Sequence, residues 1–220
     1  MKPEFILATM GDIWDEEKPL ILNDPLADPR GAYVSEVIPD SKLVIAQREM
    51  LESNPTYRQI IPYVIVTYRG EILSYRRTSK VGEQRLAGKS SVGWGGHVDI
   101  AKDAVWNTDG SLCLISTLLG CTNRELSEEL GLTSEDYESP RVLGFIAGSG
   151  SEVDKVHAGV VLTVELSMEG RVKITAEDEL TDLSFETQSD IELGDEYDRM
   201  TDNPGELESW SRAIIQSVVI

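Results

Sequence analysis

The chain has 220 residues, and its 20 Lys and Arg stand against 39 Asp and Glu, which gives a formal net charge of −19 at pH 7. Proteins that hold nucleic-acid polymers present a basic face, so this balance argues against such a partner. Hydrophobic residues make up 40% of the chain, as in an ordinary folded domain. The sequence has no run of about 18 apolar residues, and its start lacks the small-residue cleavage site of a secretory signal. We therefore expect a cytoplasmic protein that does not associate with membranes.

The charge is unevenly distributed. Residues 177–208 contain thirteen Asp and Glu against one Arg, whereas residues 69–89 contain six Lys and Arg against two Glu. A local positive strip in an acidic protein is a candidate seat for a small anion. The alternative is that these are solvated positions on a β-hairpin. The members that we expect to reach a phosphate are Arg76, Arg77, Arg85 and Lys89.

The first half of the chain contains an extension and a hairpin. Residues 1–58 are predicted to form an N-terminal extension, with a short strand at residues 5–8 and a loop rich in Pro and Asp, packed on a core domain of residues 59–220. Residues 60–68 and 71–77 are rich in Val, Ile and Tyr and are separated by Arg69-Gly70, which predicts a β-hairpin. A stretch dense in glycine follows at residues 88–96, where the backbone can turn sharply or approach a ligand closely.

The second half begins with the longest helical signal. It covers residues 111–130, with Thr108 or Asp109 as a possible cap and Gly131 at the position of a left-handed C-terminal cap. Its predicted buried stripe consists of Leu112, Ile115, Leu119, Leu126 and Leu130. Strands are predicted at residues 141–147, 156–166, 171–175 and 183–187, and an amphipathic helix at residues 205–220. This order of elements predicts an α+β fold.

The two cysteines are expected to be free thiols. Cys113 and Cys121 are eight residues apart, and on one helix that spacing separates them by about 12 Å, beyond the reach of a disulfide. His97 and His157 lie far from them in the sequence, so we expect no zinc site.

Three glutamates lie on the predicted helix at spacings i, i+3 and i+4. Glu125, Glu128 and Glu129 fall on the side away from the leucine stripe, and their mutual repulsion costs a few tenths of a kcal/mol per pair if nothing neutralises it. Carboxylate oxygens on one helix face suit a divalent cation such as Mg²⁺ or Mn²⁺. The alternative is a solvent-facing acidic helix.

The surrounding string decides between these two interpretations. RELSEELGL, residues 124–132, resembles position by position the helix of the Nudix hydrolase signature, written Arg-Glu-apolar-x-Glu-Glu-x-Gly-apolar. Upstream, the Gly95-Gly96 pair in WGGHVD resembles the glycines that open the Nudix loop. The resemblance covers about residues 55–220, and within the superfamily this part of the chain is similar to a MutT-type group of phosphoesterases. It implies an α/β/α sandwich with a mixed β-sheet and a loop-helix-loop catalytic motif.

The chain departs from the signature in its loop. Counted from Gly96, the position of the signature's first Glu is Lys102, and Arg124 comes 14 residues later than expected. Counted back from Arg124, the loop glycine would instead be Gly110 and the Glu position Ser116.

We prefer Gly96 with a 14-residue insertion, because WGGHVD resembles the loop's sequence and Gly110 stands alone. In either alignment the loop Glu is missing, and Asp99 or Asp103 is a possible substitute.

The resemblance implies hydrolysis of the pyrophosphate linkage of a nucleoside diphosphate derivative, by attack of water at phosphorus. It implies Mg²⁺ or Mn²⁺ held by Glu125 and Glu129, with Glu128 and the carbonyl of Gly96 assisting, while Arg124 orients a glutamate. Gly95 and His97 would face the substrate. The general base is open among Glu125, Glu128, Glu152, Asp154 and Glu179.

The resemblance leaves the partners and one alternative function open. The expected ligand is a small phosphorylated nucleotide, and a homodimer is possible. Because of the insertion and the missing loop Glu, the alternative is a Nudix-fold nucleotide-binding or regulatory module that does not hydrolyse its ligand.

Overall fold

A computed structural model describes most of the chain. The described residues are 3–15, 20–22, 33–78, 88–148, 151–175, 180–201 and 206–217, with only the backbone described at 20–22 and 180. The strands are β1 (Phe5–Met10), β2 (Leu20–Leu22), β3 (Leu43–Gln47), β4 (Tyr57–Tyr68), β5 (Glu71–Arg77), β6 (Ser90–Ser91), β7 (Gly93–Trp94), β8 (Arg141–Ile146), β9 (His157–Glu165) and β10 (Leu180–Glu186). The helices are α1 (Tyr33–Val37), α2 (Arg48–Leu51), α3 (Ile100–Asp103), α4 (Leu114–Leu130), α5 (Met168–Lys173), α6 (Gln188–Met200) and α7 (Ser209–Ser217).

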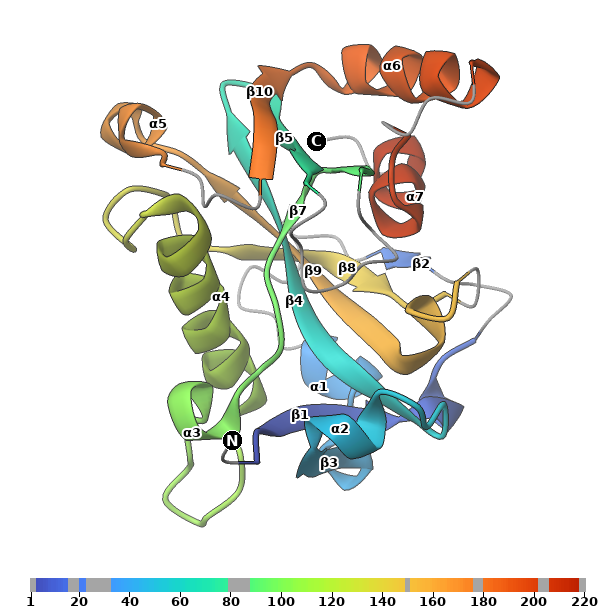
Figure 1. The fold of residues 1–220 in the computed structure, drawn as a ribbon. Helices are drawn as coiled ribbons and strands as arrows, with labels where there is room; N and C mark the ends of the chain where they lie inside the picture. Colours follow the sequence, from blue (N-terminus) through green and yellow to red (C-terminus); the bar gives the residue numbers. More distant parts are fainter. Residues whose placement is uncertain are drawn as a thin grey trace. The chain divides into compact units, whose positions relative to one another are not determined.

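The strands form one mixed sheet. Its main path has the order β10-β5-β4-β9-β8-β2, and β1, β3, β6 and β7 pair off this path. The neighbours β4 and β9 run in the same direction (Figure 1), whereas β5 is antiparallel to both β4 and β10. Mixed pairing together with separate helices confirms the predicted α+β class. None of the helices in the described part of the chain is long and apolar enough to cross a membrane.

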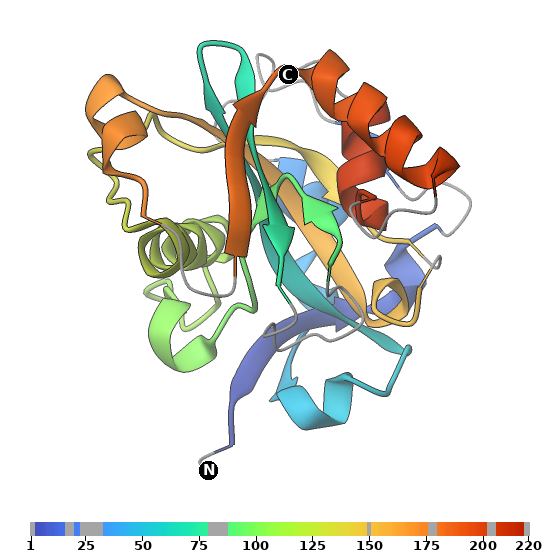
Figure 2. The ribbon, with the colours of Figure 1, turned by 45° about the horizontal axis from the view of Figure 1, so that its top comes forward.

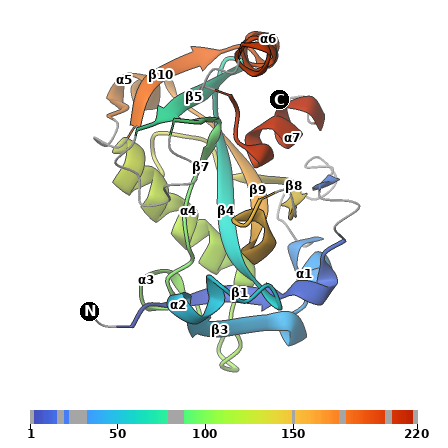
Figure 3. The ribbon, with the colours of Figure 1, turned by 45° about the vertical axis from the view of Figure 1, so that its right-hand side comes forward.

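Contacts divide the chain into two compact units. The first contains Met1–Val64, Gly95–Glu125 and Pro140–Leu162. Within it, β1 pairs antiparallel with β3, beside which it runs in Figure 3, and also with the start of β4, where Ala8 lies opposite Gln59. The N-terminal segment therefore contributes strands to the sheet. Its domain boundary at residue 58 stays a prediction.

The second unit contains Ile65–Trp94, Leu126–Ser139 and Thr163–Ile220. Here β5 lies between the end of β4 and β10, beside which it runs in Figure 2. Arg69 and Gly70 both have positive φ, 54° and 81°, which is the conformation of a two-residue hairpin turn that follows the twist of the strands. The predicted hairpin is thus confirmed.

Helix α4 begins later than expected and ends where expected. Asp109 accepts hydrogen bonds from the backbone and hydroxyl of Ser111, and this turn delays the helix to Leu114. Gly131 has a φ of 69° and ends it, with the Leu132 amide donating to the carbonyl of Leu126. The predicted stripe was partly wrong: Leu112, Ile115 and Leu119 are half-buried, and the buried apolar positions are Leu114, Leu118, Cys121, Leu126 and Leu130.

The predicted strand at residues 171–175 is wrong, because most of it lies in α5. The Ser167 hydroxyl accepts from the amide of Gly170 and caps this helix. A Cβ atom at Gly170 would lie 2.2 Å from the carbonyl oxygen of Asp136, so glycine lets the helix approach that backbone. The sequence reading also missed α6, although Thr187 and Asp190 form a reciprocal N-terminal cap.

Candidate active site

Arg124, on α4, is the centre of the candidate site in the first unit. Its Nε and Nη2 donate to the two oxygens of Asp103, both at 2.8 Å. Nη2 also donates to the carbonyl of His97 at 3.0 Å, and Nη1 donates to Oε1 of Glu125 at 2.7 Å. The hydrogen bonds to Asp103 raise the pKa of Arg124, so the guanidinium stays charged. One side chain thus connects the loop, α3 and the first glutamate of the motif.

The carboxylate of Asp103, on α3, binds Arg124. Its side chain is only 2% exposed, and besides Arg124 it accepts from the amide of Asp99 at 2.9 Å. Asp99 instead caps α3, because its carboxylate accepts from the amide of Ala101. The sequence left these two aspartates as alternatives. Of the two, Asp103 is the one whose carboxylate binds Arg124.

Two glycines allow close approaches of the loop backbone, Gly96 to Glu125 and Gly95 to Pro62. A Cβ atom at Gly96 would lie 2.6 Å from Oε1 of Glu125, and one at Gly95 would lie 1.9 Å from the carbonyl oxygen of Pro62. Gly95 also has a φ of 144°, which other residues rarely adopt. Gly110, by contrast, has nothing within 4 Å of such an atom. The contact supports the alignment from Gly96 over the alignment from Gly110.

Glu128 and Glu129 lie one turn further along α4. Helix α4 is continuous from Leu114 to Leu130, so the three glutamates keep their i, i+3 and i+4 spacing. Glu128 is exposed and Glu129 is half-buried. In the described residues, no three His, Cys, Asp or Glu side chains already converge as a metal site requires. Glu125 lies close to Gly96, where an added Cβ atom would meet Oε1 at 2.6 Å, and carboxylate oxygens are ligands that Mg²⁺ and Mn²⁺ prefer.

His97 contacts another histidine. Its Nε2 lies 3.2 Å from Nε2 of His157, whose Nδ1 lies 2.8 Å from the carbonyl oxygen of Val153. Burial, together with Arg48, His157 and Arg124, holds the pKa of His97 well below its ordinary value. His97 is therefore a neutral, half-buried ring, and its predicted contact with substrate stays a prediction.

The basic strip lies in the second unit, and its described members face carboxylates. Arg77 lies 3.6 Å from the buried Glu208, and its guanidinium also stacks over the ring of Tyr75. Lys89 pairs with Glu206 at 2.6 Å, and Arg76 lies 3.8 Å from Asp182. Arg85 lies outside the described residues.

The candidate general bases outside the motif differ in exposure. Glu152 is exposed and pairs with Lys155, whereas Asp154 is buried. Arg58 donates to the backbone carbonyl of Asp154 at 2.7 Å, an interaction that sequence reasoning missed. Glu179 lies outside the described residues.

Comparisons with known proteins identify the fold. Protein YmaB of Bacillus subtilis (strain 168) is 28% identical over 219 residues, which cover 98% of this chain and 97% of YmaB. The crystal structure of Tm1382, described as a candidate Nudix hydrolase, has a TM-score of 0.68 at 19% identity and covers 97% of this chain and 96% of Tm1382. The crystal structure of a NUDIX hydrolase from Alicyclobacillus acidocaldarius has a TM-score of 0.50 at 12% identity. The match covers 74% of this chain and 91% of that protein. No model of a known protein family matches the chain.

These similarities show that the chain has the Nudix fold. The resemblance found in the helix of residues 124–132 is thereby confirmed at the level of the fold. Activity, metal and substrate are separate questions, because identities below 25% to solved structures carry the fold alone.

Proposed function

We propose that the chain is a divalent-metal-dependent Nudix hydrolase that cleaves the pyrophosphate linkage of a nucleoside diphosphate derivative. The observation that carries this proposal is the close approach of Glu125 to Gly96, where an added Cβ atom would lie 2.6 Å from Oε1, so that the motif helix lies against its glycine loop. Arg124 supports it, since the same guanidinium binds Asp103 and orients Glu125. The fold, the glycine loop and the motif helix therefore all support a Nudix hydrolase.

Glu125, Glu128 and Glu129 would hold Mg²⁺ or Mn²⁺, with the carbonyl of Gly96 as a further ligand. When bound, the cation would neutralise the diphosphate and lower the pKa of a bound water. The role of the chain is positional: Arg124 holds the Glu125 carboxylate at 2.7 Å, and Asp103 holds Arg124. Water attack at phosphorus then needs a base, and the candidates are still Glu125, Glu128, Glu152, Asp154 and Glu179.

The proposed substrate is a small phosphorylated nucleotide. Arg76, Gly95 and His97 are proposed to contact it, together with Arg85. Arg77 and Lys89 would contribute only after exchanging Glu208 and Glu206 for phosphate oxygens. A nucleic-acid polymer is not proposed as a partner, because the net charge of −19 would repel it. We also propose a cytoplasmic location and a homodimer, which sedimentation would test.

The proposed hydrolase is tested with a panel of nucleotide sugars, dinucleoside polyphosphates, NADH, ADP-ribose and oxidised dNTPs, each with Mg²⁺ or Mn²⁺. We expect turnover of one class that Glu125→Gln and Glu129→Gln abolish while circular dichroism is unchanged. Glu135→Gln is the matched control, because Glu135 is exposed and lies after the end of α4. Turnover of either motif variant within a few-fold of the parent would contradict the metal assignment.

The alternative is a nucleotide-binding module without hydrolysis. It is motivated by the insertion and by the missing loop glutamate. The hydrogen bonds between Arg124 and Asp103 support the hydrolase instead, because they bring a carboxylate to the motif arginine. Tight binding of one compound in the panel without turnover of any would favour the module.

A further inference from the structure

Helix α6 exposes an apolar stripe. Leu193, Tyr197 and Met200, here called the α6 stripe, are 65%, 66% and 80% exposed. Their spacing of i, i+4 and i+7 places them on one face of the helix, within an arc of about 60°. The buried residues Ile191 and Asp195 lie on the opposite face. The stripe therefore faces away from the helix's own core contacts.

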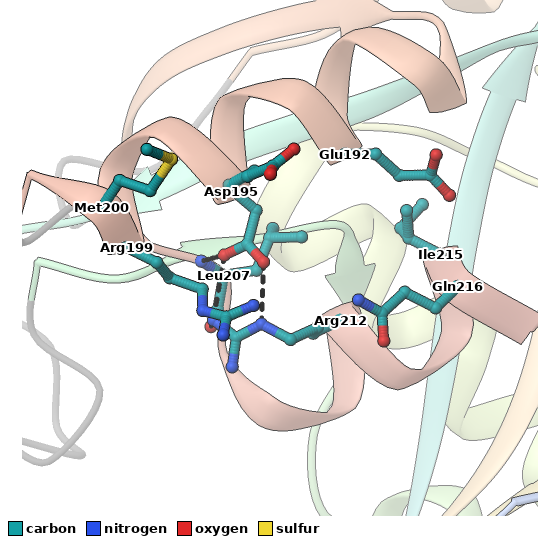
Figure 4. A pocket seen from close by; sticks show the side chains of 9 residues that line it. Glu192, Asp195, Arg199, Met200, Leu207, Arg212, Ile215 and Gln216 are labelled. Atoms are coloured by element: carbon teal, nitrogen blue, oxygen red, sulfur yellow. Dashed lines mark hydrogen bonds and ion pairs between the residues drawn. The ribbon is translucent and has the colours of Figure 1, made fainter.

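The buried face of α6 is firmly held. Asp195 accepts two hydrogen bonds from Arg212 of α7, at 2.7 and 2.9 Å, and a third from the amide of Leu207 at 2.8 Å (Figure 4). Burial would raise the pKa of Asp195, but these hydrogen bonds outweigh it and keep the pKa below its usual value. The orientation of α6, and with it the exposure of the stripe, is thus set by a charged pair.

A groove adjoins the stripe. It encloses about 580 Å³ between α6 and α7, and Met200 belongs to both the groove and the stripe. Figure 4 shows Met200 and Glu192 toward opposite ends of its lining, with the Asp195–Arg212 pair between them. Leu207 and Ile215 add apolar surface, and Glu196 adds a second exposed carboxylate. The groove is therefore apolar in part and acidic along α6.

The negative charge beside the α6 stripe indicates which kind of partner could bind there. Helix α6 carries five carboxylates, at positions 190, 192, 195, 196 and 198, against Arg199 alone. Within the described residues, neither Glu192 nor Glu196 has an ion-pair partner. A second copy of the chain would bring the same carboxylates against these, and an anionic lipid surface would be repelled as well. A cationic partner is complementary to both the stripe and its flank.

We propose that the α6 stripe and the adjoining groove bind a cationic amphipathic helix of another protein. Apolar side chains of that helix, at spacings i, i+4 and i+7, would contact Leu193, Tyr197 and Met200. Its Lys or Arg side chains would pair with Glu192 and Glu196, which sets the orientation of the complex. The proposal is independent of hydrolysis, since none of these residues belongs to the candidate active site.

The probe is a fluorescein-labelled Leu/Lys peptide of 18 residues, ordered as an amphipathic helix. One control peptide has the same composition in a scrambled order. The other has the same amphipathic pattern with Glu in place of Lys. We expect saturable binding of the first peptide, at least tenfold tighter than binding of the scrambled one, and none of the Leu/Glu peptide. Fluorescence anisotropy measures all three.

Variants then place the binding site. Leu193→Ser with Tyr197→Ser, and separately Glu192→Gln with Glu196→Gln, should each weaken binding at least tenfold, with the fold checked by circular dichroism. The matched control is Met168→Ser with Val172→Ser on α5, where the two side chains are 58% and 81% exposed. This control should bind like the parent.

Six results would overturn the proposal. Four come from the peptide assay: equal binding of the ordered and scrambled peptides, equal weakening by the α5 control, unchanged binding by the α6 variants, and the absence of binding. A dimer in sedimentation that Leu193→Ser with Tyr197→Ser dissociates would assign the stripe to a second copy of the chain and would also overturn it. So would binding to phosphatidylserine vesicles that depends on the stripe.

Discussion

Arg124 and Asp103, 21 residues apart in the sequence, form a two-pronged ion pair with both N···O distances at 2.8 Å. Asp103 lies on α3, within the segment that departs from the Nudix signature, and Arg124 is the first residue of the matching string. The pair therefore closes the inserted loop onto the motif helix. It brings a carboxylate to the first residue of the motif, although the position of the signature's first Glu, counted from Gly96, is Lys102.

Asp103→Asn should destabilise the first unit. Removing one partner of a buried ion pair leaves the other charge uncompensated and typically costs about 3–5 kcal/mol of the free energy of unfolding. Asp99→Ala removes a helix cap and should cost about 1 kcal/mol. Urea unfolding followed by circular dichroism gives both values. A larger loss for Asp99→Ala than for Asp103→Asn would contradict the assignment of the pair.

Gly96→Ala should lower metal-dependent turnover at least tenfold. The added Cβ would lie 2.6 Å from Oε1 of Glu125, so the carboxylate has to move from its position against the loop. Gly148→Ala is the matched control, because its Cβ would meet its nearest neighbour at an ordinary 3.6 Å. Steady-state kinetics on the substrate found in the panel measures the effect. Equal activity of the two variants would show that the Gly96 contact is unimportant for turnover.

Two helical glycines should respond in opposite directions to alanine. Gly170→Ala places a Cβ 2.2 Å from the carbonyl oxygen of Asp136, so we expect a loss of about 1–3 kcal/mol from strain. Gly194→Ala has open space and should stabilise α6 by about 0.5–1 kcal/mol through helix propensity. Thermal unfolding of the two variants tests the packing of α5 and α6 together. The prediction fails if both changes have the same sign.

Arg77→Met should cost more stability than Arg76→Met. Arg77 pairs with the buried carboxylate of Glu208 at 3.6 Å, so its removal takes a positive charge away from a buried carboxylate, at a cost of about 1–3 kcal/mol. Arg76 lies 3.8 Å from the exposed Asp182, a pair that contributes about 0–1 kcal/mol. Chemical unfolding ranks the two variants. If Arg76→Met is the more destabilising, the structural role given to Arg77 is wrong.

Asp136→Asn should make stability less dependent on acid pH. Hydrogen bonds from Lys173 and Thr133 lower the pKa of Asp136 to about 2, against about 3.9 in an unfolded chain. A carboxyl group with a lowered pKa stabilises the fold above the unfolded value, and that contribution disappears as the pH falls toward 2. The parent should therefore exceed the variant in stability at pH 7, and the difference should shrink between about pH 4 and pH 2. Unfolding at several pH values measures it, and Lys173→Met should reproduce part of the loss at pH 7.

Local patterns were sufficient for several elements of this fold. The hairpin at Arg69-Gly70 and the end of α4 at Gly131 were predicted correctly, because a positive φ is a requirement of the backbone itself that glycine meets at little cost. Residues 124–132 predicted the Nudix fold because they resemble the helix of the Nudix signature. Such a local resemblance is informative, since the positions of side chains around one helix follow from residue number alone.

Elements that depend on neighbours distant in the sequence were missed or misplaced. Residues 171–173 have the composition of a strand but form the end of α5, because Gly170 packs closely against the backbone of Asp136. The β1 strand was expected, but its pairing with β3 and β4 was not, since register depends on which segments meet. The acidic stretch was correctly located, whereas the helix within it and the apolar face of that helix were not expected.

The sequence alone thus predicted the motif, its three glutamates and the loss of the loop carboxylate. Only the tertiary structure showed that Asp103 binds Arg124 while Asp99 caps α3, and that Gly96, unlike Gly110, lies close to Glu125. Both findings concern which atoms approach one another between segments that are distant in the sequence. Spacing along the chain does not determine that distance, because it depends on how the loop folds back against α4.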